Sequence, residues 1–549
     1  MTDSAFVNIA THLETMAERQ PYTLAVVFPY GRDCRGRVSY THLTYRQLNE
    51  ECDRIAHGLQ QVGIGRGVRT VLMVKPSLEF FALTFALFKV GAIPILIDPG
   101  MGVRNLGQCL GEAEPQAFIG IPKAHAARVV LGWGRRSIRT CVTVGSRWCW
   151  GGATLDQVRQ LGERAGRFEL ARTSQDEMAA ILFTSGSTGV PKGAVYTHGI
   201  FAAQVDILRR LYGIEPGEID LQTFPLFGLF APALGMTTIV PDMDATRPAE
   251  VDPRKIIEAI ENFGVTNLFG SPALLNRVGR FGVEQKIKLP SLKRVLSAGA
   301  PVSAEVMERF AAMLAPGVEI STPYGATEAL PVCSIGSAEV LSQTRTLTQQ
   351  GAGVCVGRPV AEIQLKVIHI SDDAIPVWSD DLVLPRGEIG ELVVKGPMVT
   401  REYYHRPEST ALAKIADSDA LYHRMGDVGY LDEVGRVWFC GRKSHRVVTP
   451  QGTLFTIPCE AVFNTHPKVY RTALVGVGPR PILCIELEKS ADQSDREGLR
   501  KELLALAASQ PHTVNITTFL FHPSFPVDIR HNAKIFREKL AVWAARKLA

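Results

Sequence analysis

Helical and extended patterns alternate along the first half of the chain, and this alternation restricts the fold more than any other feature of the sequence. A helix predicted at 44–63 begins at a capping box and ends at a glycine, and short apolar strands follow at 68–74 and 93–97. The same order of elements recurs at about 179–211 and at 252–269. Because strands joined by helices usually run parallel, we expect parallel sheets that are covered by helices on both faces.

The second half of the chain has a different pattern of predicted secondary structure. After about residue 360, short β-rich pieces are separated by turns rich in proline and aspartate, which predicts a small β subdomain. The last part of the chain has apolar strands and a helix of its own. We therefore expect a large N-terminal domain at 1–440, with the β-rich part at about 360–440, and a small α+β C-terminal domain at 443–549.

Charge and hydropathy exclude several classes of protein. Lysine plus arginine number 60 against 55 aspartate plus glutamate, a balance of +5 that is spread along the chain, so we expect no nucleic-acid partner. The longest apolar run, at 80–97, is interrupted by Lys89 and Pro94 and predicts buried core rather than a transmembrane segment.

The first residues lack a secretion signal, which predicts a cytoplasmic protein. The 10 cysteines form no C-x-x-C pair, which argues against a zinc site and against a disulfide framework.

A loop at 183–193, directly after an apolar strand, is the strongest local signal of chemistry. Its glycines let backbone N–H groups converge on an anion, its hydroxyls add donors, and its lysine adds a positive charge. A Walker A loop is excluded, because Pro191 precedes the lysine and Gly193 follows it, where that motif needs a glycine and a hydroxyl. The pattern predicts a polyphosphate-binding loop whose candidate residues are Thr184, Ser185, Gly186, Ser187, Thr188, Gly189 and Lys192.

Further motifs follow this loop, at 297–301 (SAGAP), 324–328 (YGATE), 425–427 (MGD), 441–443 (GRK) and 532–535 (NAKI). In their order and spacing they resemble the motifs of the acyl-adenylate-forming superfamily of AMP-binding enzymes, and the resemblance covers almost the whole chain. It implies an α/β fold with a large N-terminal domain of two doubly wound sheets plus a small β-barrel-like subdomain. A small mobile α+β domain follows as a cap. The resemblance also implies ATP and Mg²⁺ as cofactors.

The residues of these motifs have the chemistry that ATP binding requires. The backbone at Gly299, Ala300 and Pro301 and the ring of Tyr324 suit a flat adenine. Asp427 can accept hydrogen bonds from both ribose hydroxyls, and the resemblance gives a ribose contact to Arg442 as well.

Catalytic and metal-binding roles fall on other motif residues. Glu328 is the hard oxygen ligand expected for Mg²⁺ beside a triphosphate, and the resemblance adds Thr188 as a second metal and catalytic residue. Thr327 suits the α-phosphate, and Gly325 belongs to the same motif. Lys534 is the candidate catalytic residue of the first step, because an ammonium between a carboxylate and the α-phosphate stabilises the charge that develops there.

An apolar segment at 224–230 is the candidate acyl pocket. Gly228 stands where many fatty-acyl relatives have histidine, and a glycine among bulky residues leaves room for a branched chain. The apolar neighbourhood suits a long aliphatic substrate, although a buried strand and helix would have the same composition. The candidate pocket residues are Phe227, Gly228 and Phe230.

Within the superfamily, the sequence is similar to the β-lactone synthetases of bacterial long-chain olefin biosynthesis. That resemblance implies adenylation of a long-chain 2-alkyl-3-hydroxyalkanoic acid and cyclisation through its own 3-hydroxyl, with His198 or His445 as the candidate base. It also implies an assembly with the hydrolase and the reductase of the same pathway. Two alternatives stay open: a long-chain fatty acyl-CoA or acyl-AMP ligase, and a non-catalytic nucleotide-binding scaffold.

Overall fold

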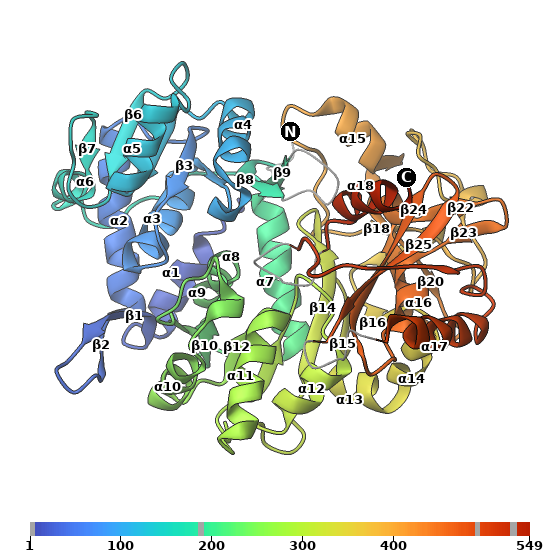
Figure 1. Cartoon of the computed structure of the whole chain (residues 1–549). Coiled ribbons are helices and arrows are strands. Elements are labelled where there is room, and N and C mark those ends of the chain that lie inside the picture. Colours follow the sequence, from blue (N-terminus) through green and yellow to red (C-terminus); the bar gives the residue numbers. More distant parts are fainter. Residues whose placement is uncertain (1–5, 185–190, 489–494, 528–534) are drawn as a thin grey trace.

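The computed structural model describes residues 6–184, 191–488, 495–527 and 535–549, and the chain is an α/β protein with parallel sheets, as predicted (Figure 1). Helix α7 (His198–Tyr212) stands between the two large sheets. Val205 of this helix belongs to the apolar core beneath helix α3 (Leu78–Lys89), and Ile207 belongs to the core behind strand β15 (Ala329–Gly336). Helix α7 therefore joins the two halves of the large domain.

The first sheet has strands in the order β7-β6-β5-β3-β4-β8-β9. Neighbouring strands are parallel except β8 and β9, which are antiparallel and are joined by the predicted phosphate loop. Strands β4 and β5 are buried at every position, as expected for strands that are covered on both faces. The bounds are β3 (Arg69–Met73), β4 (Ile93–Leu96), β5 (Ala117–Gly120), β6 (Thr140–Thr143), β7 (Ala153–Thr154), β8 (Met178–Thr184) and β9 (Lys192–Thr197).

Helices pack on this sheet from both sides (Figure 1). Helix α2 begins at the predicted capping box, since the Thr44 hydroxyl accepts from the Gln47 backbone and the Gln47 side chain accepts from the Thr44 backbone. Each helix of the described ranges is too short or too polar to traverse a lipid bilayer. The remaining bounds are α1 (Thr11–Arg19), α2 (Tyr45–Gln61), α4 (Val103–Ala113), α5 (Pro122–Leu131) and α6 (Leu155–Gly162).

The apolar run at 80–97 forms buried core, as predicted, and it includes a fully buried lysine. Lys89 ends helix α3, and its ammonium lies 2.5 Å from the Asp53 carboxylate and 3.0 Å from that of Glu14. A buried ammonium is tolerated only when opposite charges and hydrogen bonds replace its hydration. These carboxylates therefore allow a charged residue inside a helix that is otherwise apolar.

The second sheet is longer, in the order β17-β18-β20-β21-β16-β15-β14-β13-β12-β10-β11-β1-β2. Its centre, from β14 to β1, is parallel, and from β14 to β17 neighbouring strands are antiparallel. The bounds are β1 (Leu24–Arg32), β2 (Val38–Thr44), β10 (Ile219–Gln222), β11 (Thr237–Ile239), β12 (Asn267–Phe269), β13 (Arg294–Leu296), β14 (Ile320–Ala326), β16 (Val354–Pro359), β17 (Gln364–Ile368), β18 (Gly390–Lys395), β20 (Ala420–Leu431) and β21 (Val437–Arg442). The β-rich region predicted at 360–440 thus continues this sheet through β15. Helices α10 (Pro253–Phe263), α11 (Pro272–Glu284) and α12 (Ala304–Ala311) accompany the parallel part.

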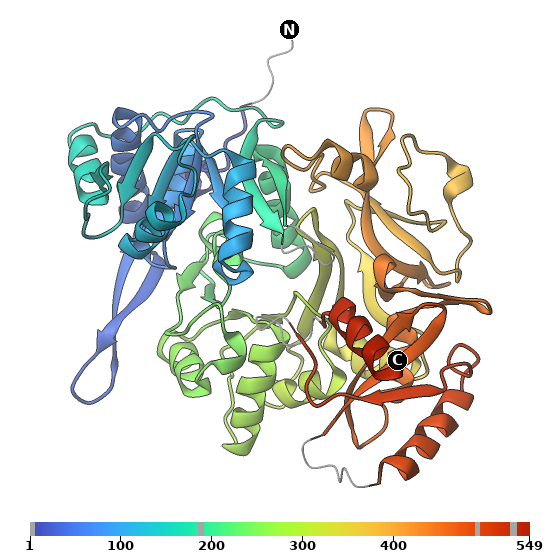
Figure 2. The same ribbon diagram turned by 45° about the horizontal axis from the view of Figure 1, so that its top comes forward.

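After Arg442 the chain leaves the second sheet. Strands β24 (Val469–Val477), β25 (Arg480–Leu487) and β26 (Thr518–Phe521) form a separate small sheet, which lies beside the β-rich region (Figure 2). Arg537, at the start of helix α18, holds the buried Glu460 of helix α16 at 2.6 Å. The division at 1–440 and 443–549 stays a prediction, and the change of sheet falls close to it. The helices are α16 (Thr456–Phe463), α17 (Arg496–Ala508) and α18 (Arg537–Leu548).

A buried carboxyl in the second sheet predicts a pH-dependent stability. Asp220 of β10 is buried beside the Asn267 amide, and this burial raises the pKa of its carboxyl to about 7. Ionisation is therefore harder in the folded chain than in the unfolded one, so Asp220 costs stability progressively as the pH rises from about 4 to 7. We expect Asp220→Asn to stabilise the protein, by up to about 4 kcal/mol above pH 7 and by less at pH 5.

Thermal unfolding at pH 5 and pH 8 checks this expectation. The matched control is Asp176→Asn, because the Asp176 side chain is 74% exposed. A gain for Asp220→Asn that is equal at both pH values would contradict the assigned cause.

Candidate functional site

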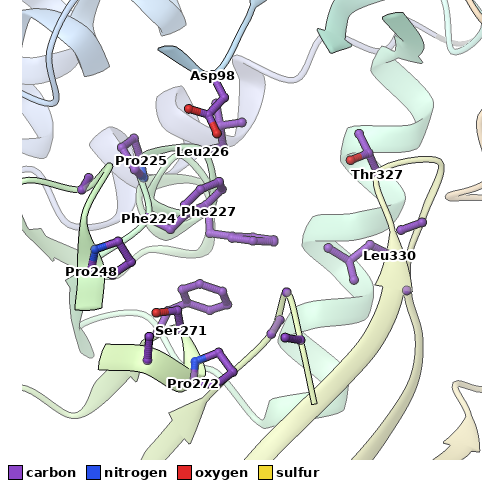
Figure 3. A pocket seen from close by; sticks show the side chains of 18 of the residues that line it. Asp98, Phe224, Pro225, Leu226, Phe227, Pro248, Ser271, Pro272, Thr327 and Leu330 are labelled. Atoms are coloured by element: carbon purple, nitrogen blue, oxygen red, sulfur yellow. The ribbon is translucent and has the colours of Figure 1, made fainter. Parts of the chain in front are cut away.

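A cavity of about 2540 Å³ is lined by residues of both large sheets, of α7 and of the C-terminal part. One region of its wall is apolar, and Figure 3 shows Phe224 and Phe227 facing Leu330 across the space. Another region is polar and includes Lys192 and Glu328. The cavity thus combines the surfaces that an aliphatic chain and a phosphorylated group would each require.

The ends of the predicted phosphate loop meet at this cavity. Thr184 and Lys192 are paired across the β8–β9 hairpin, and Lys192 lines the cavity wall. The Lys192 ammonium lies 5.0 Å from the centre of the Tyr403 ring, a cation–π distance. Ser185, Gly186, Ser187, Thr188 and Gly189 lie outside the described residues. The described end of the predicted loop, Lys192, therefore lies in the polar region of the cavity.

Glu328 lies in the turn between β14 and β15 and is held by a residue that the sequence did not indicate. The Tyr403 hydroxyl donates to Glu328 Oε1 at 2.6 Å, and the Thr400 backbone donates to the Glu328 carbonyl at 2.9 Å. Burial and the Glu328 charge raise the pKa of Tyr403 well above its usual range, so this hydroxyl stays a donor. Within the described part of the chain, Glu328 Oε2 has no hydrogen-bond partner, and the carboxyl faces the cavity.

The turn that presents Glu328 requires a glycine. A Cβ at Gly325 would lie 2.5 Å from the Ala329 carbonyl oxygen, because β14 and β15 come together at this point. The next residue but one, Thr327, lines the cavity, and its carbonyl accepts a hydrogen bond from the Tyr196 hydroxyl. The YGATE motif is thus fixed by close backbone packing and by a tyrosine from β9.

Asp427, Arg442 and Tyr324 form a buried polar cluster. The Tyr324 hydroxyl donates to Asp427 Oδ2 at 2.6 Å, and Arg442 Nη1 lies 2.9 Å from Asp427 Oδ1. Burial raises the pKa of the Asp427 carboxyl, while the Arg442 charge opposes that shift. The cavity wall beside this cluster is formed by Gly426 and Arg442.

Three of the four adenine candidates line the cavity, whereas the fourth, Tyr324, lies behind its wall. Gly299, Ala300 and Pro301 line its wall directly after strand β13, and Gly299 has a φ of +94°, a conformation that favours glycine. Lys534 lies outside the described residues. Its neighbour Ile535 and Arg537 line the same cavity as Lys192.

The structure does not bring His198 to this site. Its ring is fully buried in the core at the start of α7, and its Nδ1 accepts from the Ile9 backbone at 3.2 Å. Burial lowers the pKa of His198 to about 4, so the ring is neutral and structural at ordinary pH. The prediction of His198 as a base is therefore corrected, whereas His445, the other candidate, lines the cavity.

Phe227 and Phe230 line the cavity, but the role expected for Gly228 is corrected. A Cβ at Gly228 would lie 2.0 Å from Cγ and 2.5 Å from Cδ of Gln222. The space beside the glycine is therefore already filled by the Gln222 side chain and does not receive a branched acyl chain. The sequence did not reveal this contact, because no motif or periodic pattern links Gln222 to Gly228.

The chain belongs to the AMP-binding enzymes, because it matches the model of that family over residues 13–404. It is 52% identical to the olefin β-lactone synthetase of Xanthomonas campestris and 51% identical to that of Stenotrophomonas maltophilia. Each match covers 98% of this chain and 98% of the relative. Among solved structures, the amide bond synthetase of Marinactinospora thermotolerans is similar with a TM-score of 0.78 and 22% identity, over 97% of this chain and 99% of that one. This last likeness supports the fold.

The contact between Gly228 and Gln222 gives a prediction about stability. We expect Gly228→Ala to destabilise the protein by about 1 to 3 kcal/mol, because the added methyl must displace a buried side chain. Chemical denaturation measures the effect. The matched control is Gly111→Ala in helix α4, where an added Cβ meets nothing within 4 Å and where alanine favours the helix by about 0.5 to 1 kcal/mol. Equal stability changes in the two variants would contradict the assigned contact.

Proposed function

We propose that this protein is an ATP-dependent β-lactone synthetase that acts on a long-chain 2-alkyl-3-hydroxyalkanoic acid. The observation that supports it most strongly is the identity of 52% and 51%, over nearly full length, with two olefin β-lactone synthetases. A cavity with an apolar wall and a polar wall suits a substrate that has an alkyl chain and a carboxylate.

The first step joins the substrate to AMP. A carboxylate oxygen attacks the α-phosphorus of ATP, and pyrophosphate leaves with the bonding electron pair. In our proposal, the loop at 184–189 and Lys192 bind the phosphates, and Lys534 stabilises the negative charge that develops between the reacting groups. Thr327 contacts the α-phosphate in this arrangement.

The nucleoside would contact residues from the parallel half and from the antiparallel half of the second sheet. We assign the adenine to Gly299, Ala300 and Pro301 together with Tyr324, and the ribose to Asp427 and Arg442. Because Asp427 lies behind Gly426 and is already held by Tyr324 and Arg442, ribose binding requires the Arg442 side chain to share this carboxylate.

The residues present fit a magnesium ion. One Glu328 oxygen accepts from Tyr403, and the other is available at the cavity. No cluster of three or more histidine, cysteine or acidic side chains exists among the residues that the structure describes, so phosphate oxygens and water would supply the other ligands. We propose that Glu328 and Thr188 hold Mg²⁺, which neutralises phosphate charge.

The second step closes the ring. The 3-hydroxyl oxygen bonds to the acyl carbon, the bond from that carbon to the phosphate oxygen breaks, and AMP leaves with the electron pair. The hydroxyl proton passes to a base, for which His445 in the cavity wall is the candidate. Attack within one bound molecule needs no second substrate, which favours closure over transfer to an external thiol.

Incubation with ATP, Mg²⁺ and a synthetic 2-alkyl-3-hydroxy acid, without CoA, tests the proposal. We expect β-lactone, AMP and pyrophosphate in equal amounts, measured by NMR and by a coupled pyrophosphate assay. Product that appears only after addition of CoA would instead identify an acyl-CoA ligase, and nucleotide binding without turnover would identify a scaffold.

The role of Lys534 is tested separately. We expect Lys534→Ala to bind ATP with nearly unchanged affinity, because the lysine acts mainly on the charge of the transition state. Its rate of pyrophosphate release should fall by about a hundredfold or more. Calorimetric ATP binding and single-turnover kinetics separate the two effects, and Lys539→Ala in helix α18 is the control. Normal turnover of Lys534→Ala would refute the assignment.

An assembly with a hydrolase and a reductase, and a cytoplasmic location, complete the proposal. Both rest on the family resemblance of the sequence. Co-purification of the tagged chain from its native cell tests the assembly.

A further inference from the structure

Gln222 presents an amide that has no partner in an otherwise apolar wall. The residue ends strand β10, is 3% exposed and lines the cavity. In the described part of the chain, neither its Nε2 nor its Oε1 has a hydrogen-bond partner, although both atoms are buried. A buried amide with no partner destabilises the folded state, so an arrangement of this kind needs a reason other than stability.

The position of this amide is determined by its neighbours. Gly228 leaves the space in which the Gln222 side chain lies, since a Cβ there would be 2.0 Å from Gln222 Cγ. Gly228 sits in the short helix α8 (Pro225–Gly228) with no left-handed φ, so its lack of a side chain serves this contact rather than a turn. Any larger residue at position 228 would displace the Gln222 side chain, so the glycine allows the amide to occupy this position.

The surroundings of the amide are apolar and rigid. Phe227 packs on Phe269 with ring centres 4.5 Å apart, and Phe269 is the register partner of Gln222 across β10 and β12. The adjacent Thr223 hydroxyl donates to the Phe269 carbonyl at 2.5 Å, which fixes the end of β10. An alkyl chain can pack against this wall, but an alkyl chain has no donor or acceptor for the Gln222 amide.

We propose that the Gln222 amide binds and orients the 3-hydroxyl of the substrate, an inference that rests on the proposed function. A hydroxyl is both a donor and an acceptor, and an amide supplies the complementary Oε1 and Nε2. A neutral amide is too weak a base to remove the proton, so Gln222 is a positioning residue that directs the hydroxyl oxygen toward the acyl carbon. It also distinguishes a 3-hydroxy acid from an acid without that hydroxyl, because only the former satisfies the buried amide.

Gln222→Met tests this role, because methionine has nearly the same shape and has no amide. Two substrates are compared, a 2-alkyl-3-hydroxy acid and the same acid without the hydroxyl, with single-turnover pyrophosphate release as the common readout, because the second acid cannot release AMP by ring closure. We expect the second-order rate constant of this release to fall about tenfold for the hydroxy acid, the effect of losing one hydrogen bond, and to change less than twofold for the other acid. A larger share of the adenylate should also hydrolyse to free acid instead of closing to lactone.

Gln204→Met is the matched control in the same cavity. Gln204 Nε2 donates to the Leu330 carbonyl at 2.8 Å, and among the described residues only its Oε1 is without a partner, so this amide is already held by the protein and its loss should affect both substrates equally. The melting temperature of ligand-free Gln222→Met should equal or exceed that of the wild type, because an unpaired buried amide has been removed. This readout separates a positioning role from a structural one.

The outcomes distinguish this inference from the proposed function. If the wild type forms no lactone from the hydroxy acid, the proposed function fails. If it forms lactone and Gln222→Met keeps both the preference for the hydroxy acid and the share of lactone, the inference about Gln222 is overturned. A loss of preference in Gln204→Met alone would overturn it as well.

Discussion

The hairpin between β14 and β15 joins the parallel half of the long sheet to its antiparallel half, and the site is organised around this turn. The two strands approach so closely that only glycine fits at position 325. Tyr324 before this turn donates to Asp427 on β20, and Glu328 within the turn accepts from Tyr403 at the cavity wall. The strand pairing therefore fixes the relative positions of the groups assigned to ribose and to the metal.

Charges are buried at the junction of the large body and the C-terminal part, and each is paired. Glu391 is fully buried and lies 2.7 Å from Arg424 and 3.2 Å from Lys443. Lys443 directly follows Arg442, whose partner is Asp427. Because a buried charge without its partner costs several kcal/mol, this network holds the start of the C-terminal part against the β-rich region.

The two regions of the cavity follow different physical rules. In the polar region, the Glu328 and Asp427 carboxylates are each held by a tyrosine hydroxyl, and within the described residues the second oxygen of Glu328 has no hydrogen-bond partner. In the apolar region, aromatic packing excludes water around one glutamine whose amide has no partner. Stability and function are opposed at this glutamine, as expected where a binding site must recognise a polar group inside an apolar pocket.

The sequence by itself determined the parallel α/β class and the order of the motifs, because periodicity and local residue chemistry are properties of short segments. It also determined the buried apolar run at 80–97 and the capping box at Thr44, and it predicts the phosphate loop. Only the tertiary structure decided that Tyr403 holds Glu328, that His198 is core, and that Gly228 makes room for Gln222. These outcomes depend on which segments come together and on which space a side chain leaves to its neighbours, and no local pattern contains that information.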